Sequence, residues 1–237
     1  MTTEIFVINY YDLVLPRGAL LLMHDFEYVP NYEWESVRDE LLDIIHRLQD
    51  EVREHFTFQY HFVGSSKRRM ITRDRNSNVG FDFDVNIEVN DLDEDYSAEE
   101  IRNILHKGLD RVTNPYGFSI FGYDYTEDST RVLTIKVKDK ARSCILHSCD
   151  FCIVYECDDG RQQYIRYNKQ QNSYTWEYQP KGFMELPAKI DWIKEHGLWQ
   201  EVRDRYLYKK NMNDNPNKHS RTIFAETVHE VWQKNRT

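Results

Sequence analysis

The sequence has no long apolar run and little cysteine, proline or glycine. No stretch approaches the roughly 20 apolar residues of a membrane-spanning helix. The opening MTTEIFVINYYDL has no basic segment like the one that begins a secretory signal. The 237 residues include only 4 cysteines, 6 prolines and 9 glycines, without repeats or low-complexity tracts. We therefore expect a cytoplasmic protein with no membrane partner.

An excess of basic charge is also missing. The 31 lysines and arginines face 40 aspartates and glutamates, so the net charge is −9. This charge argues against a general nucleic-acid binder, and any basic surface must be local. A chain of this length forms one large domain or two tightly joined lobes.

The four cysteines lie close together in the sequence, at Cys144, Cys149, Cys152 and Cys157. Cys149 and Cys152 have the spacing of a zinc-ligand pair, so a zinc-stabilised interaction protein is one alternative. The segment has the pattern of a strand, however, and residues three apart in a strand face opposite ways. We therefore favour reduced, mostly buried thiols, which fit a cytosolic location.

Apolar periodicity predicts both helices and strands. Ser97 and Glu100 form a capping-box pattern before a helix over 98–112. For residues 5–29 the pattern does not decide between short strands and an extended arm. The other expected helices cover 33–54, 187–196, 198–210 and 220–234. The expected strands cover 56–63, 131–138, 144–156 and 163–167, the last after a hairpin turn at 158–160.

The most informative stretch joins a Gly-Ser-Ser step to an Asp-x-Asp pair. Gly64, Ser65 and Ser66 follow an expected strand, and Asp82 and Asp84 lie in an alternating apolar segment. Both carboxylates therefore point the same way. Mg²⁺ prefers such oxygen ligands together with substrate phosphates, and a glycine at a helix start lets phosphate approach backbone N–H groups. The stretch predicts a nucleotide-phosphate and metal site, whereas the simpler interpretation is a solvated strand face.

Between these motifs lie five basic residues in nine positions. One interpretation is a solvated helix face opposite Met70 and Ile71. The other is a patch that attracts a triphosphate or an acceptor strand. The basic residues are Lys67, Arg68, Arg69, Arg73 and Arg75.

An acidic stretch follows the Asp-x-Asp segment, with carboxylates at Asp91, Asp93, Glu94 and Asp95. Such a run invites a calcium interpretation. It lacks the glycine and the final glutamate of an EF-hand loop. We therefore do not predict a calcium site here.

The combined pattern resembles the polymerase-β superfamily of nucleotidyltransferases. The motif of that family is a Gly-Ser at a helix start, an acidic-x-acidic pair and a third acidic residue on a later strand. Gly64, Ser65, Asp82 and Asp84 match the first parts, and Asp150 in HSCDFCIVYE matches the last. Within the superfamily, the chain is most similar to the branch of oligoadenylate synthases and bacterial cyclic-oligonucleotide synthases.

The resemblance, over about residues 35–235, implies an α+β fold. It implies a catalytic lobe over 1–182, with a mixed or antiparallel sheet, flanking helices and a long spine helix at about 33–54. A small helical lobe would cover 183–237, which is short for the family and leaves the acceptor or base pocket in doubt.

The helical lobe carries a second set of similarities. RYLYKKN and HSRTIFAE resemble the family's basic helix end and the serine-led helix that faces the donor triphosphate. Lys209 or Lys210, with Ser220, would then bind the β- and γ-phosphates. The alternative is a solvated lysine pair and an ordinary serine cap. Trp176 or Tyr178 is a further candidate for stacking on a base.

The resemblance implies transfer of a nucleoside monophosphate from an NTP to a hydroxyl, with release of pyrophosphate. Asp82, Asp84 and Asp150 would hold two Mg²⁺ or Mn²⁺ ions, and Asp150 would be the general base or an acceptor-side ligand. Ser65 and Ser66 would position the triphosphate. The acceptor stays open: a cyclic or linear oligonucleotide in antiviral signalling, a protein as in nucleotidyltransferase antitoxins, an antibiotic or an RNA end. A catalytically silent nucleotide-binding or interaction protein of the same fold is the rival, and the oligomeric state is unassigned.

Overall fold

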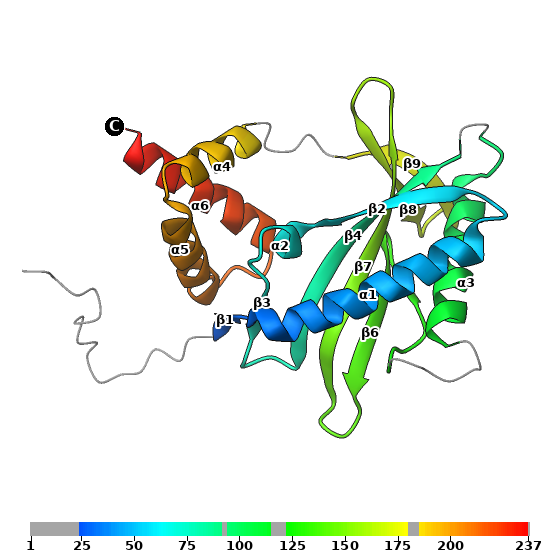
Figure 1. Cartoon of the computed structure of the whole chain (residues 1–237), viewed down its shortest axis with the longest axis horizontal. Coiled ribbons are helices and arrows are strands. Elements are labelled where there is room, and N and C mark those ends of the chain that lie inside the picture. The colour runs from blue at the N-terminus through cyan, green and yellow to red at the C-terminus, as the bar shows by residue number, and fades with distance from the viewer. Residues whose placement is uncertain (1–23, 92–93, 115–121, 180–184, 237) are drawn as a thin grey trace, which may run out of the picture.

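The computed structural model describes residues 24–91, 94–114, 122–179 and 185–236. A mixed sheet is covered on one face by two long helices, and three further helices pack together at one end of the molecule (Figure 1). The helices are α1 (Asn31–Val52), α2 (Gly64–Lys67), α3 (Ala98–Thr113), α4 (Leu186–Glu195), α5 (Trp199–Asn211) and α6 (Ser220–Asn235). Among the described residues, no helix is both long and apolar enough to cross a membrane.

Nine strands accompany these helices. They are β1 (Phe26–Tyr28), β2 (Thr57–Val63), β3 (Thr72–Asp74), β4 (Val79–Asn90), β5 (Glu127–Asp128), β6 (Val132–Asp139), β7 (Cys144–Glu156), β8 (Gln162–Asn168) and β9 (Ser173–Tyr178) in the described part of the chain. The expected helices and strands of the sequence analysis are confirmed to within a few residues, except in the basic segment discussed below. The strand β9 and the short β5 were not predicted.

The main sheet has the order β2-β4-β7-β6-β5, and β8 pairs with both β7 and β9. Strands β4 and β7 run parallel, whereas the other described pairs run antiparallel. Their register places Phe83 opposite Cys149 and Asp84 opposite Asp150. The centre of the sheet therefore brings the Asp-x-Asp segment beside the later aspartate.

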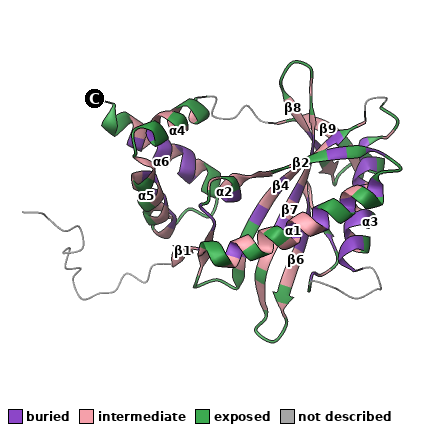
Figure 2. Cartoon of the chain, in the orientation of Figure 1, coloured by how far each residue is buried: buried purple, intermediate pink, exposed green. Residues whose placement is uncertain are grey.

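The alternation of β4 separates a core face from a polar face. Its apolar residues are buried beneath α1 and α3, and buried and less buried positions alternate along the strand (Figure 2). The two aspartates lie on the opposite face because neighbouring strand residues point to opposite sides. In α3, Ser97 and Glu100 form the expected capping box. The apolar residues of β4 in this core are Phe81, Phe83, Val85, Ile87 and Val89.

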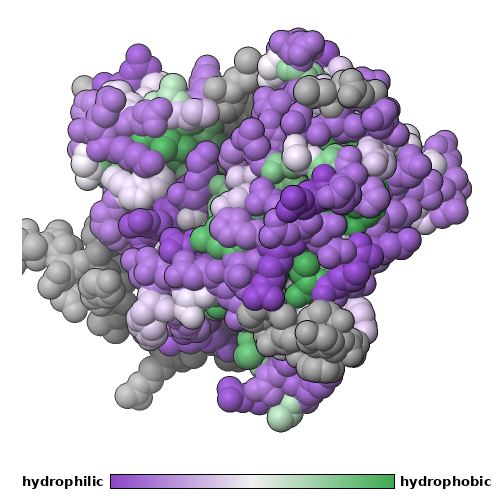
Figure 3. Space-filling model, turned by 45° about the vertical axis from the view of Figure 1, so that its right-hand side comes forward, coloured by the Kyte–Doolittle hydropathy of each residue, from purple (hydrophilic) through white to green (hydrophobic). Residues whose placement is uncertain are grey.

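The helices α4, α5 and α6 build a second core, which includes Val202, Tyr206 and Phe224. Met70, from the segment between α2 and β3, is buried in the same core and so links it to the sheet. The expected lobe boundary at residue 182 lies outside the described residues, and this division stays a prediction. Hydrophilic residues cover most of the face in Figure 3, with hydrophobic residues in small areas between them.

The interpretation of the basic segment as a helix face is wrong. Helix α2 ends at Lys67, and Arg69 adopts a positive φ of 54°, which an α-helix does not allow. The chain then enters β3, which pairs with β1. Arg73 forms ion pairs with Glu27 and Glu33.

Arg75 is neutralised in the same way, by an ion pair with Asp25 at 2.8 Å. These acidic partners lie 40 to 50 positions before the arginines with which they pair, so the local charge count overstated the basic character of the segment. The strand β1 is the described part of the region that the sequence left open at 5–29, and residues 5–23 lie outside the described residues.

Candidate functional site

A cavity of about 700 Å³ opens between the polar face of the sheet and the helices α5 and α6. Asp82 and Asp84 line it from β4, and Asp150 lines it from β7. Because neighbouring strands are about 4.8 Å apart, the paired Asp84 and Asp150 present their carboxylates side by side. The structure thus brings together all three aspartates that the sequence singled out.

The three carboxylates share an electrostatically unfavourable position. Burial raises the pKa of Asp84 to about 6, and repulsion from Asp82 and Asp150 adds to this effect. Burial also raises the pKa of Asp82, against the attraction of Lys210. For Asp150, burial raises the pKa, while a 2.6 Å hydrogen bond from the Thr134 hydroxyl opposes it. A cation bound here would relieve the repulsion.

The donor set fits a divalent ion such as Mg²⁺ or Mn²⁺ in an open site. Such ions take one or two carboxylates and complete their shell with water and substrate phosphates. In the part of the chain that the structure describes, no group of three or more His, Cys, Asp or Glu side chains is arranged so that it could hold a metal ion without further ligands. The carboxylates therefore suit a site completed by substrate better than a closed protein cage.

The start of α2 reaches the cavity at Gly64 and Ser65. Gly64 has a φ of +62°, and a Cβ built on it would lie 2.2 Å from Oδ2 of Asp84. Only glycine allows this approach of the backbone to the carboxylate. Ser66, also singled out by the sequence, is buried, and its hydroxyl donates to the Val63 carbonyl at 2.9 Å instead.

Lys210 lines the cavity from α5, opposite the aspartates. Its Nζ donates to Thr72 Oγ1 at 2.7 Å and lies 3.8 Å from the centre of the Phe26 ring. Burial lowers the pKa of Lys210 to about 8, even though Asp82 opposes the shift. Of the two candidate lysines, Lys209 points elsewhere and forms an ion pair with Glu230.

Two arginines complete the cationic wall. Arg68 lines the cavity with its guanidinium 4.1 Å from the centre of the Phe224 ring, and its buried Nε has no hydrogen-bond partner among the described residues. Burial lowers the pKa of Arg68, and the charge of Arg221 lowers it further. Arg221 follows Ser220, which also lines the cavity, and it forms no salt bridge with any described residue. Two such guanidinium groups favour an anion between them.

No motif in the sequence pointed to Arg221 or Thr134 as site residues. Arg221 is adjacent to the predicted Ser220 in HSRTIFAE, and this position is the one signal that could have pointed to it. No sequence pattern marks Thr134 as a site residue, because its role depends on the strand register that pairs it with Asp150.

Three neutral amides and several apolar groups also line the cavity. The amides belong to Asn86, Gln162 and Gln179. Cys152 is also part of this wall, whereas Cys149 is buried in the core on the other face of β7.

The expected stacking of an aromatic residue on a base is not supported at this cavity. Trp176 lines a different cavity on the helix-covered face of the sheet. Tyr178 lies at the surface, with the Arg161 guanidinium 3.9 Å from its ring centre. Trp176 and Tyr178 are two positions apart in β9 and so point to the same, helix-covered face of the sheet, whereas Gln179 beside them lines the aspartate cavity.

Comparison with solved structures identifies the fold. The DncV protein of Vibrio cholerae with bound GTP matches with a TM-score of 0.53 and 14% identity, over 86% of this chain and 52% of DncV. CdnG, a CD-NTase of Bradyrhizobium diazoefficiens in complex with GTP, matches with a TM-score of 0.53 and 11% identity, over 85% of this chain and 66% of CdnG. DncV in complex with the linear intermediate 5′ pppA(3′,5′)pG matches with a TM-score of 0.52 and 13% identity, over 86% of this chain and 52% of DncV.

These matches confirm the resemblance at the level of fold. The chain has the polymerase-β-like nucleotidyltransferase fold, as an α+β structure with a central mixed sheet. It spans about half the length of the DncV chains. No protein-family model matches the sequence, and no curated protein sequence is significantly similar to it.

Proposed function

We propose that the protein is a divalent-metal-dependent nucleotidyltransferase that transfers a nucleoside monophosphate from an NTP to a hydroxyl and releases pyrophosphate. One observation carries this proposal. A single cavity has three clustered carboxylates, at Asp82, Asp84 and Asp150, on one wall and lysine and arginine side chains on the opposite wall. This arrangement is complementary to a metal–triphosphate complex, which presents cations to the carboxylates and phosphate oxygens to the opposite wall.

The cationic wall would hold the leaving part of the substrate. Arg68, Lys210 and Arg221 would bind the β- and γ-phosphates and stabilise the pyrophosphate as it departs. Ser65 and Ser220 would donate hydroxyl hydrogen bonds to the same oxygens. Gly64 would let the phosphates approach the backbone.

The aspartates would act at the reacting end. Mg²⁺ or Mn²⁺, held by Asp82, Asp84 and Asp150, would neutralise the phosphates and lower the pKa of the acceptor hydroxyl. Asp150 would accept the proton of that hydroxyl, and its raised pKa suits this role. Thr134 would orient the carboxylate through its hydrogen bond to Oδ1.

The neutral wall favours a nucleoside as the acceptor. Asn86, Gln162 and Gln179 offer amide donors and acceptors that match the edges of a base, and among the described residues no lysine or arginine lines the cavity besides Arg68, Lys210 and Arg221. The acidic net charge also disfavours long RNA. We therefore favour a cyclic or linear oligonucleotide product, of the kind used in antiviral signalling, over an antibiotic or an RNA end.

Product analysis tests the proposal. The protein is incubated with all four NTPs and Mg²⁺ or Mn²⁺, and pyrophosphate and nucleotides are followed by mass-resolved chromatography. The Asp82→Ala/Asp84→Ala variant is run beside it. Glu88→Gln is the matched control, because Glu88 lies on the same face of β4 but outside the cavity.

A new oligonucleotide from the wild type and from Glu88→Gln, but not from the double variant, supports the proposal. Release of pyrophosphate without a nucleotide product would indicate that the acceptor is a protein or another molecule. Metal-dependent NTP binding without any turnover under all these conditions favours the catalytically silent rival. The absence of NTP binding contradicts both nucleotide functions.

A further inference from the structure

A second cavity, of about 410 Å³, lies on the face of the sheet opposite the aspartates. Its floor is apolar, with Val89 from β4 and Ala98 and Ile101 from α3. Val89 is an odd-numbered residue of β4 and so faces away from Asp82 and Asp84. The volume lies in the range of small-molecule sites, roughly 300–1,000 Å³.

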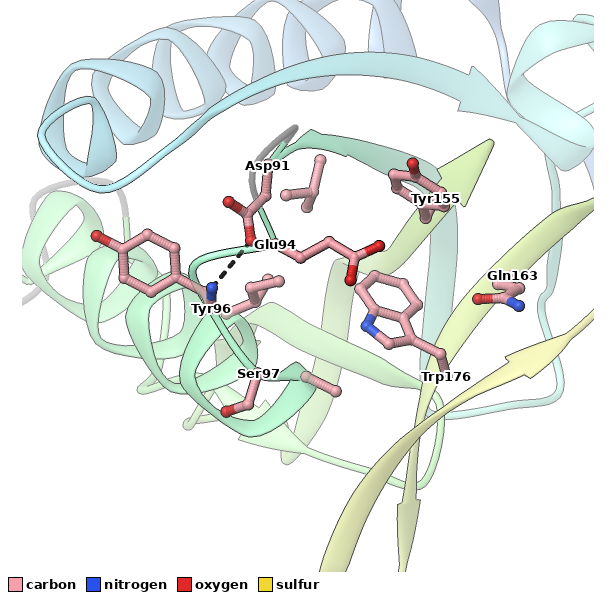
Figure 4. Close-up of a pocket in the computed structure, with 10 residues that line it drawn as sticks. Asp91, Glu94, Tyr96, Ser97, Tyr155, Gln163 and Trp176 are labelled. Carbon is pink, nitrogen blue, oxygen red and sulfur yellow. Dashed lines mark hydrogen bonds between the residues drawn. The ribbon is translucent and has the colours of Figure 1, made fainter. Parts of the chain in front are cut away.

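Two aromatic side chains form one wall of this cavity. Trp176 of β9 and Tyr155 of β7 contact each other with ring centres 6.2 Å apart, and both line the cavity. Figure 4 shows the Glu94 side chain extending toward Trp176, and it shows Gln163 on the neighbouring strand. Aromatic faces beside a carboxylate are typical of cation-binding sites.

Four of the polar groups at this cavity have no partner among the described residues. Within the described residues, the Glu94 carboxylate, the Gln163 amide, the Tyr155 hydroxyl and the Trp176 indole N–H have no hydrogen-bond or ion-pair partner. Asp91 differs, because its carboxylate accepts the backbone N–H groups of Asp95 and Tyr96. Asp91 therefore stabilises the loop, whereas Glu94 is free to bind a ligand.

The charge of the lining defines the ligand. Two carboxylates line the cavity, and no lysine, arginine or histidine does so among the described residues. A nucleotide or another anion would be repelled here. A guanidinium group is planar, cationic and rich in donors, so it would stack on Trp176 while donating to Glu94 and to the Gln163 carbonyl.

We propose that this cavity is a binding site for a guanidinium-type organic cation, separate from the nucleotide cavity. The site does not depend on the proposed catalytic function. A free small molecule and an arginine side chain of another protein share this chemistry, and the cavity admits the head group of either.

Ligand-observed NMR titration with phenylguanidine tests the proposal. Phenylurea is the neutral probe of nearly the same shape. We expect saturable binding of phenylguanidine in the millimolar range or tighter, and binding of phenylurea weaker by at least about tenfold. Acetyl-arginine-amide separates the two sources: if it binds as well as phenylguanidine, a protein arginine is an accepted ligand, and if it does not, the site selects free small molecules.

Matched variants locate the bound probe. Glu94→Gln should weaken phenylguanidine binding by at least about fivefold, since the carboxylate is lost and the shape is kept. Glu99→Gln, an exposed carboxylate of α3 outside the cavity, should leave the affinity unchanged. Trp176→Leu should weaken binding while keeping an apolar side chain, and near-ultraviolet circular dichroism checks its folding.

Because a cation could instead bind the three aspartates, Asp84→Asn is included as a locator. The proposal requires this variant to keep the wild-type affinity for phenylguanidine. Loss of binding in Asp84→Asn with retention in Glu94→Gln would overturn it. Equal affinities for phenylguanidine and phenylurea, or no binding of either, would overturn it as well.

Discussion

Gly64 and Asp84 are in such close contact that no side chain fits between them. A Cβ at Gly64 would lie 2.2 Å from the Oδ2 atom of Asp84, and the backbone there has a φ of +62°. The Gly-Ser step and the Asp-x-Asp pair, about twenty positions apart in the sequence, are therefore parts of one site.

Replacing Gly64 by alanine should displace Asp84. We expect Gly64→Ala to lower nucleotidyl transfer by about a hundredfold, because a shift of about 1 Å at a reacting centre has this effect. The positive φ should also lower the free energy of unfolding by about 1–2 kcal/mol. Pyrophosphate release and thermal unfolding measure the two effects.

Gly160→Ala is the matched control for this prediction. Gly160 has a φ of +74° and nothing within 4 Å of a built Cβ. It should show the same loss of stability and keep its activity. Equal losses of activity in both variants would contradict a specific contact between Gly64 and Asp84.

Removing one carboxylate should stabilise the metal-free protein. Asp84 lies opposite Asp150 and near Asp82, so we expect Asp84→Asn to raise the free energy of unfolding by about 0.5–1 kcal/mol at neutral pH. Mg²⁺ should raise the melting temperature of the wild type but not that of the variant. Calorimetry with EDTA or Mg²⁺ provides the measurement, and a destabilised Asp84→Asn would show that existing contacts already satisfy this carboxylate.

The two neighbouring lysines of α5 should differ in function. Lys210 lines the cavity that contains Asp82, Asp84 and Asp150, whereas Lys209 is paired with Glu230. We expect Lys210→Met to weaken NTP binding by roughly 10- to 100-fold, the usual value of a charge-assisted phosphate contact. Lys209→Met should change the affinity little. Calorimetric titration with a nonhydrolysable NTP compares them, and equal losses would refute the assignment.

Arg221 should matter more for NTP binding than Arg75 of the basic segment. Arg221 lines the cavity without a salt bridge to any described residue, but Arg75 is held by Asp25. Arg221→Gln should raise the Kd for NTP by about tenfold or more, and Arg75→Gln by less than about twofold. The salt dependence of binding should become shallower only in Arg221→Gln. The reverse order would restore the functional interpretation of the basic segment.

Acid should destabilise the protein partly through His147. Burial lowers the pKa of His147 from 6.5 to about 4, so the folded state keeps this ring neutral, while the unfolded state takes up a proton below pH 6.5. The contribution of His147 to the free energy of unfolding is therefore complete above pH 6.5 and is lost as the pH falls toward 4.

Denaturant unfolding between pH 4.5 and 7.5 measures this contribution. His147→Gln should flatten the fall in the free energy of unfolding over this range by up to about 1 kcal/mol per pH unit. His219→Gln, at an exposed position, should leave the slope unchanged. An unaltered slope in His147→Gln would show that other groups dominate acid unfolding.

Local patterns predicted the parts of the site that lie within single elements. The alternation around Asp82 and Asp84 and the Ser97–Glu100 capping box depend on neighbouring residues, and the structure contains both. Asp150 was found through its resemblance to a family motif, since an aspartate flanked by apolar strand residues has no distinctive pattern of its own.

The predictions that failed concern residues whose surroundings depend on contacts between distant segments. The acidic partners of Arg73 and Arg75 precede them by about 40 to 50 residues, so the sequence pattern indicated a free basic patch. Arg68 and Arg221 approach one another only because α6 packs against the segment after α2. The assignment of Trp176 to a base failed because its strand pairing places it on the opposite face of the sheet.

The buried alternation of β4 also protects the site from errors of folding. A slip of one residue against β7 would turn Asp82 and Asp84 into the core beneath α1 and expose Phe83 on the polar face of the sheet. Such a pairing would bury charge and expose aromatic surface, so it would be strongly disfavoured. Every molecule that forms the native core therefore presents Asp82 and Asp84 in the same orientation. The burial of apolar residues in β4 thus fixes the geometry of the acidic pair as well as the stability of the fold.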